Sequence, residues 1–305
     1  MKLREAFDWG RLAPLKLRAS TLADGVYAGA HRSLRRGAGV EFGGHRNYVP
    51  GDELRFLDRH ARMRHGLLLI REFETETDRA LRLILDASAS MGFRSADAPA
   101  AKYAYAALLA AALARVALAR GDRVSLDFIG GEQAVGLPSI GGREAFDRVV
   151  GHLETARPKG VTARTELETA LAPTVRYARR GTAVVVLSDL VDLPDGAPEL
   201  VAGLSAAGRS VIVVQVLDPV ELTFPFQGPI ALAALEGDTR VETEAAAARS
   251  AYLEALEALT TTWESAVVAR GGKLVRAGTH GDPVEAVRRV LDALSRARDG
   301  ERRHR

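Results

Sequence analysis

The stretch LRLILDASAS, residues 81–90, joins an apolar run to a loop in which one carboxylate and two hydroxyls alternate with alanine. Leu81–Asp86 has the composition of a β-strand, and its last residue is acidic. From this point onward, short β-rich runs alternate with helical stretches. That alternation predicts an α/β fold, with a mostly parallel sheet that has helices on both faces.

The same pattern locates the other elements. Further strands are expected at Val124–Ile129, Gln133–Leu137, Thr182–Leu187, Ser210–Leu217 and Lys273–Arg276. Gly130-Gly131 joins the first two of these into a hairpin, which adds one antiparallel edge strand. Helices are expected at Pro99–Arg120, Gly142–Glu154, Thr165–Arg180, Ala197–Ala207, Glu242–Ala269 and Pro283–Arg298.

Length and composition set limits on the class of protein. The 305 residues allow one large domain or two ordinary ones, and 47% hydrophobic with 27% charged residues is typical of a globular protein. The absence of cysteine excludes disulfides, thiolate zinc sites and cysteine nucleophiles. Lys102 and Arg115 interrupt the most apolar stretch, so we expect no membrane span. No signal-peptide core is recognisable, and a cytoplasmic location is expected.

The charge is unevenly distributed along the chain. Residues 1–71 carry fourteen Lys/Arg against seven Asp/Glu, whereas residues 81–295 carry twenty-two against twenty-six. This asymmetry predicts an N-terminal basic accessory lobe at residues 1–80, a body at residues 81–298 and a disordered tail at residues 299–305. The lobe could bind nucleic acid, but few aromatic residues accompany its charge, so a solvated lobe is the preferred interpretation.

Polar side chains gather where predicted strands end, which is where open α/β sheets bind ligands. Asp86, Ser88 and Ser90 follow the first strand, Thr162 and Thr165 precede a helix, and Asp189 follows Thr182–Leu187. Carboxylate and hydroxyl oxygens suit a hard cation such as Mg²⁺ or Mn²⁺. Because hydroxyls leave the ion under-neutralised, an external carboxylate is an attractive further ligand. This chemistry favours ion-mediated protein recognition over hydrolysis.

The arrangement Asp86-x-Ser88-x-Ser90, with a loop threonine and a later strand-end aspartate, resembles the metal-ion-dependent adhesion site of von Willebrand factor type A domains. The upstream segments GAGVEF (37–42), RNYVPGD (46–52) and REFE (71–74) narrow the match. In that order they resemble the bacterial domain-of-unknown-function family fifty-eight, over roughly residues 25–295.

The resemblance implies a von Willebrand factor A-like, Rossmann-like fold. It implies these metal ligands: Asp86, Ser88, Ser90, Thr165 and Asp189. Thr162 is the substitute candidate for Thr165. It also implies a MoxR-type AAA+ ATPase as partner, in the assembly or maturation of another complex. The client protein of that complex would carry the acidic ligand residue.

Enzyme motifs are not recognisable in the sequence. It contains no Gly-x-Ser-x-Gly elbow, no Walker A sequence and no His-Glu-x-x-His. We therefore expect a non-enzymatic interaction protein without catalytic residues. A metal-dependent phosphoester hydrolase is the alternative, because a carboxylate–hydroxyl site could polarise a phosphate. Asp218, which precedes Pro219, is interpreted as a turn former, and His60 and His65 lack companions at metal-ligand spacing.

Overall fold

The computed structural model describes residues 9–29, 41–47, 69–74, 80–191, 193–233 and 240–303. The chain divides into two compact units, residues 30–79 and the remainder, which we call the body. In the first unit, β1 (Glu41–Asn47) pairs antiparallel with β2 (Leu69–Glu74). Most of the predicted RNYVPGD element, together with His60 and His65, lies outside the described residues.

The body is built on a six-stranded sheet with the order β10-β7-β6-β3-β4-β5. All neighbouring strands are parallel except β4 and β5, which are antiparallel. The strands are β3 (Ala80–Asp86), β4 (Arg123–Ile129), β5 (Leu137–Ile140), β6 (Ala183–Ser188), β7 (Ser210–Leu217) and β10 (Lys273–Gly278). This is the predicted α/β architecture, a mostly parallel sheet with one antiparallel edge strand.

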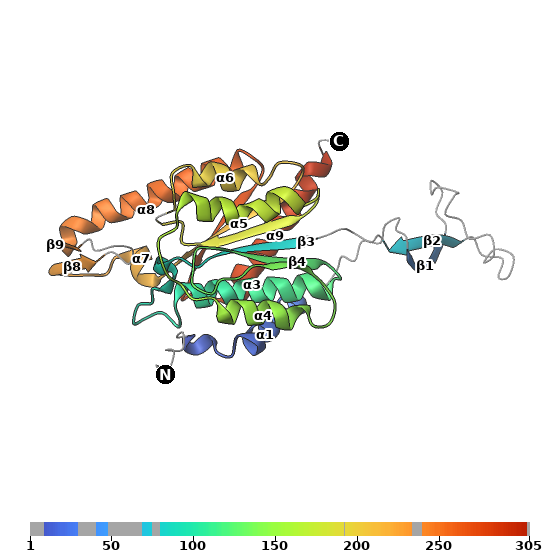
Figure 1. Ribbon diagram of the computed structural model, residues 1–305, viewed down its shortest axis with the longest axis horizontal. Coiled ribbons are helices and arrows are strands. Elements are labelled where there is room, and N and C mark those ends of the chain that lie inside the picture. The colour runs from blue at the N-terminus through green and yellow to red at the C-terminus, as the bar shows by residue number, and fades with distance from the viewer. Residues whose placement is uncertain are drawn as a thin grey trace. The chain divides into compact units, whose positions relative to one another are not determined.

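Helices cover both faces of this sheet (Figure 1). Leu83 and Leu85 of β3 enter the core beneath α1, α3, α4 and α9, whereas Ile84 enters the core beneath α5, α6 and α8. The long helices are α1 (Leu15–Gly29), α3 (Lys102–Ala119), α4 (Ala145–Thr155), α5 (Arg164–Tyr177), α6 (Ala197–Gly203), α8 (Ala245–Val268) and α9 (Pro283–Arg303). The shorter elements are η1 (Gly10–Leu12), η3 (Ala89–Gly92), α7 (Pro219–Thr223) and the antiparallel pair β8 (Pro229–Ala233) and β9 (Arg240–Glu244).

The central helix of the body is α3, and all but three of its 18 residues are buried. Its many alanines let α1, α4 and α9 pack closely against it. By length and composition α3 could cross a bilayer, but 83% of it is buried inside the body, as expected of a core helix. The helix begins at Lys102 and not at the predicted Pro99, whose carbonyl accepts a hydrogen bond from the N–H of Arg11.

The separate unit does not have the bounds of the predicted lobe at residues 1–80. Helix α1 belongs to the body, because Leu15, Ala19, Leu22 and Val26 recur every three or four residues and are buried in the core that contains α3 and α9. The separate unit is therefore residues 30–79. At the other end, α9 continues to Arg303, so the predicted tail is helical over most of its length.

Two further boundaries shift because glycine-containing turns replace predicted regular structure. Strand β5 occupies Leu137–Ile140 instead of Gln133–Leu137, and the preceding loop contains Gly130 and Gly131, both with positive φ. Helix α6 ends at Gly203, four residues before the predicted Ala207, and turns follow it as far as Gly208.

Candidate metal centre

The loops after β3 and β6 meet at the carboxyl edge of the sheet. These strands are neighbours, but the chain proceeds from β3 to β4 on one side and reaches β6 on the other side only later. Such a topological switch point is where open α/β sheets bind ligands. Asp86 ends β3 and Ser188 ends β6, and the Ser188 hydroxyl donates a hydrogen bond of 2.6 Å to Asp86 Oδ2.

Three predicted ligands lie together in the loop after β3. The backbone N–H of Ser88 donates to Asp86 Oδ1 over 2.9 Å, and the Oγ atoms of Ser88 and Ser90 are 3.1 Å apart. Adjacent oxygens in an octahedral Mg²⁺ shell are separated by about 3 Å, since each lies about 2.1 Å from the ion. The two hydroxyls are hydrogen-bonded to each other, and their separation also fits one edge of such a shell. All three side chains are buried.

The segment that carries Thr162 is tied to this loop by backbone hydrogen bonds. The N–H of Lys159 donates to the carbonyl of Ala87, and the N–H of Ala89 donates to the carbonyl of Gly160. Gly131 contributes as well, because its φ of +90° and its close approach to Ala87 leave no room for a side chain. These contacts bring three loops, those after β3, β4 and α4, to one point.

The two candidate threonines differ in burial. Thr162 is buried, and its Oγ1 has no hydrogen-bond partner among the described residues. A Cβ placed on Gly130 would lie 3.4 Å from Thr162 Oγ1 and 3.9 Å from Ser88 N, so both atoms lie beside the side-chain-free face of Gly130. Thr165 is exposed in the first turn of α5 and lines a shallow depression of about 270 Å³ together with Gly130. A buried hydroxyl without a hydrogen-bond partner in the described part of the chain favours Thr162 as the threonine ligand. A ligand role for Thr165 stays a prediction.

Asp189 lies close to these groups but is engaged by a buried lysine. Its Oδ2 accepts a hydrogen bond of 2.7 Å from Lys102 Nζ, and its Oδ1 accepts one of 3.0 Å from the N–H of Val191. The same ammonium contacts Glu221 Oε1 over 2.5 Å. The Lys102 side chain is only 1% exposed. One ammonium therefore serves two carboxylates, and Asp86 has no direct cationic partner among the described residues.

The electrostatics of the centre favour a further cation. Burial and the carboxylate of Asp189 raise the pKa of Asp86 to about 7, while the hydrogen bonds from Ser188 and Ser88 oppose that rise. Although burial works against it, Asp189 and Glu221 hold the pKa of Lys102 above its ordinary value, so the ammonium stays charged. A dication beside Asp86 would favour its ionised form.

The loop after β6 is held in a strained conformation. Leu190 has φ +68°, which is unfavourable for a branched side chain, yet it is 1% exposed and its N–H donates to Ser188 Oγ over 2.9 Å. This conformation fixes Ser188 and Asp189 against the loop after β3.

Sequence reasoning missed Lys102 and Glu221, and it noted Ser188 beside Asp189 after the strand without giving Ser188 a role. A lysine in an otherwise apolar helix was the available signal for Lys102, because a buried lysine needs an acidic partner. The interpretation of Asp218 as a turn former is confirmed, since its Oδ1 accepts the N–H of Val220 at the start of α7. Its Oδ2 also accepts the N–H of Ser95, which links α7 to the loop after β3.

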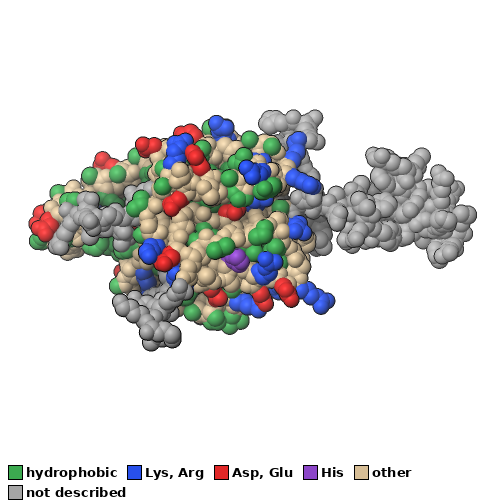
Figure 2. Space-filling model, in the orientation of Figure 1, with side chains coloured by type: hydrophobic (Ala, Val, Ile, Leu, Met, Phe, Trp, Pro, Cys, Tyr) green, Lys and Arg blue, Asp and Glu red, His purple; other side chains and the backbone are tan. Residues whose placement is uncertain are grey.

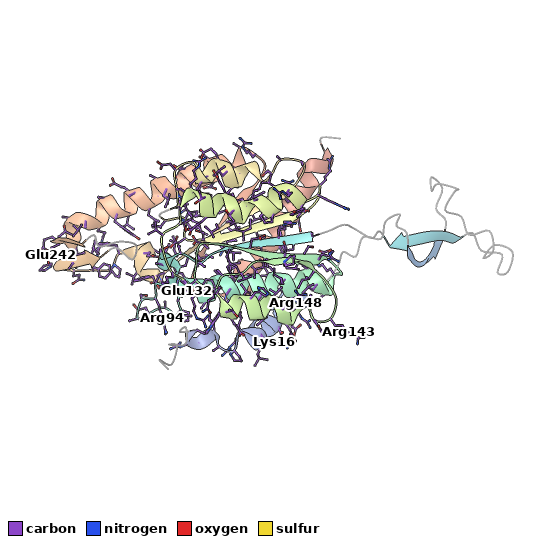
Figure 3. The ribbon with its side chains drawn as sticks, in the orientation of Figure 1. Lys16, Arg94, Glu132, Arg143, Arg148 and Glu242 are labelled. Carbon is purple, nitrogen blue, oxygen red and sulfur yellow. The ribbon has the colours of Figure 1, made fainter. Side chains whose placement is uncertain are left out.

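Hydroxyls are essential to any metal binding here. In the part of the chain that the structure describes, no three His, Asp or Glu side chains converge as a metal-ligand set. A larger depression, of about 450 Å³, lies on the β8–β9 ribbon and contains none of the candidate ligands. Figure 3 labels two acidic side chains, and Glu132, in the loop after β4, is the one nearer to the carboxyl edge of the six-stranded sheet.

Comparison with known proteins confirms the predicted family. The family model described as Protein of unknown function DUF58 matches residues 44–261. The chain belongs to this family. It is 28% identical over 221 residues to Uncharacterized protein Mb1516 of Mycobacterium bovis and to Uncharacterized protein Rv1480 of Mycobacterium tuberculosis. The aligned region covers 72% of this chain and 68% of each relative.

Solved structures of similar shape have low sequence identity. The conserved hypothetical protein BatB from Bacteroides thetaiotaomicron is 16% identical with a TM-score of 0.47, covering 71% of this chain and 98% of that one. A von Willebrand factor type A protein from Catenulispora acidiphila is 10% identical with a TM-score of 0.42, covering 75% of this chain and 44% of that one.

Proposed function

We propose that this chain is a non-enzymatic protein-interaction module that binds Mg²⁺ or Mn²⁺ at an adhesion-type site. The proposed ligands are Asp86, Ser88, Ser90, Thr162 and Asp189. The observation that carries the proposal is the pair of buried hydroxyls, 3.1 Å apart, beside a carboxylate whose pKa is raised to about 7 by burial and by Asp189. The unpartnered hydroxyl of Thr162 supplies a third neutral oxygen nearby.

The chain's own residues prepare the site. Ser188 and the N–H of Ser88 orient both oxygens of Asp86, and Lys102 holds Asp189 through a direct hydrogen bond. When bound, the ion would supply an open coordination position for a carboxylate from another protein. Such a site would recognise a client protein through one acidic residue, with its affinity dependent on the divalent cation.

By family resemblance, we further propose that the chain works in the cytoplasm with a MoxR-type AAA+ ATPase, in the assembly or maturation of another complex. The purified chain should co-elute with its cognate ATPase or change its ATP turnover. If the chain does neither, this partnership fails while the metal proposal still stands.

The metal proposal is tested by titrating Mg²⁺ and Mn²⁺ into the wild type, Asp86→Asn and Asp127→Asn, with thermal unfolding as the measurement. Asp127 is a matched control, because it is a partly buried aspartate on the neighbouring strand β4, paired with Arg82. Stabilisation of the wild type and of Asp127→Asn, but not of Asp86→Asn, is expected. Equal responses of all three proteins would remove the site. Phosphoester turnover that is lost in Asp86→Asn would instead favour the hydrolase alternative.

A further inference from the structure

The two ends of the body's sheet carry opposite charge. The segments at the amino ends of the parallel strands hold eight Lys/Arg and two Asp/Glu, counted over residues 120–123, 141–144, 178–182, 204–209 and 269–273. The described loops at the carboxyl ends hold three Lys/Arg and six Asp/Glu, counted over residues 87–101, 130–136, 156–163, 189–191, 193–196, 218 and 279–282. Figure 2 shows many blue side chains toward the end of the body where β3 begins. The basic end therefore lies opposite the candidate metal centre.

Four arginines define this basic end, and we call them the arginine rim: Arg120, Arg143, Arg180 and Arg270. Each comes from a different loop, is exposed, and has no ion pair among the described residues. Figure 3 shows Arg143 projecting from the loop after β5. Cations at the ends of α3, α5 and α8 offset the helix dipoles, but Arg143 follows a strand, so dipole compensation does not account for the whole rim.

Two of these arginines, Arg180 and Arg270, follow helices whose last turns expose apolar side chains. Val175 and Tyr177 in the last turn of α5 are 59% and 63% exposed, and Val268 at the end of α8 is 55% exposed. Nucleic acid would pair with the arginines but would gain little from the valines. A lipid surface satisfies both, because phosphate groups pair with guanidinium groups while apolar side chains enter the headgroup region.

We infer that the arginine rim, with Val175, Tyr177 and Val268, docks the body on an anionic lipid surface. This mode of binding is peripheral and needs no membrane-spanning segment. It leaves the candidate metal centre at the opposite end of the sheet facing away from the bilayer, where a client protein could reach it. The lipid interaction is independent of the metal.

The test uses the full chain and vesicles of phosphatidylcholine with or without phosphatidylglycerol, with cosedimentation as the measurement. The wild type should bind only the vesicles that contain phosphatidylglycerol, and high salt should release it. Because each basic residue near such a surface strengthens partitioning roughly fivefold, the triple variant Arg120→Gln/Arg180→Gln/Arg270→Gln should bind about a hundredfold more weakly. Val175→Ser/Val268→Ser should weaken binding without changing its salt dependence.

The control variant Arg11→Gln/Arg18→Gln/Lys159→Gln removes the same charge from exposed positions outside the rim and should change binding only a few-fold. Failure of the wild type to bind phosphatidylglycerol vesicles would overturn the inference, whether or not any variant folds. An equal loss in the rim and control variants would overturn it as well. So would salt-sensitive binding to duplex DNA or to polyglutamate in place of the vesicles.

Discussion

Replacement of Asp86 by asparagine should remove a specific pH dependence of stability. The pKa of Asp86 is about 7 in the folded chain, raised by burial and by Asp189, against an ordinary value of 3.8. Between these two values the folded chain binds more protons than the unfolded chain, so stability is higher at low pH and falls as pH rises. At 1.36 kcal/mol per pKa unit, the wild type should lose about 3 kcal/mol between about pH 5 and pH 8 through this residue.

The assay is urea unfolding at a series of pH values, in chelator and in excess Mg²⁺, for the wild type, Asp86→Asn and Asp127→Asn. In chelator, Asp86→Asn should lack the loss assigned to Asp86. The loss should persist in Asp127→Asn, although the pKa of Asp127, raised by burial to about 6, adds a smaller slope of its own in the wild type. Stabilisation by Mg²⁺ should grow with pH, because the ion binds ionised Asp86. Identical slopes for the wild type and Asp86→Asn would refute the reasoning, and so would a Mg²⁺ response that does not change with pH.

Three other substitutions probe the surroundings of the site. Lys102→Met should lower the free energy of unfolding by about 3–5 kcal/mol, because Asp189 and Glu221 then lose their buried counter-ion; a loss below about 1 kcal/mol in urea unfolding would contradict this. Gly131→Ala should destabilise by about 2 kcal/mol, since φ is +90° and the new Cβ would lie 2.6 Å from the Cβ of Ala87; unchanged thermal unfolding would contradict it. Thr162→Ala should weaken Mg²⁺ binding by about tenfold or more, since even loss of a group that only orients a metal ligand costs roughly that much, while Thr165→Ala should leave calorimetric affinity unchanged. The opposite result would assign the ligand role to Thr165.

The strands of the sheet were predictable because a short run of apolar residues indicates a strand that is buried on both faces. Strands β6 and β7 are apolar on both faces, as a strand with helices above and below must be, and the prediction for Ser210–Leu217 matches β7 at both ends. The same logic placed Asp86 at the carboxyl end of its strand, which the structure confirms for β3. The other acidic and hydroxyl residues of the candidate site were predicted in the same way, from their positions in loops that follow strands or precede helices.

The membership of α1 in the body was not predictable in the same way. Its apolar residues have helical spacing, but what buries them is the alanine-rich surface of α3, about eighty residues further along the chain. The basic composition of residues 1–71 suggested a single lobe. The charge composition of a long segment does not show where one helix within it packs. The packing of α1 depends only on the apolar face of that helix.

The role of Lys102 also depends on long-range contacts. Its partners Asp189 and Glu221 are 87 and 119 residues away in the sequence, so no local pattern connects them. The choice between Thr162 and Thr165 depends on loop conformation, since only two residues lie between a buried hydroxyl and an exposed one. The sequence predicts which carboxylate and hydroxyl residues follow the strands, and the fold shows which of them lie together.

The most direct test of the metal centre is an anomalous difference map from crystals of the full chain grown with Mn²⁺. The account predicts one peak per chain within bonding distance of the Ser88 and Ser90 hydroxyls, beside the carboxylate of Asp86. A map without a peak at the carboxyl ends of β3 and β6, or with its only peak at another place, would contradict it.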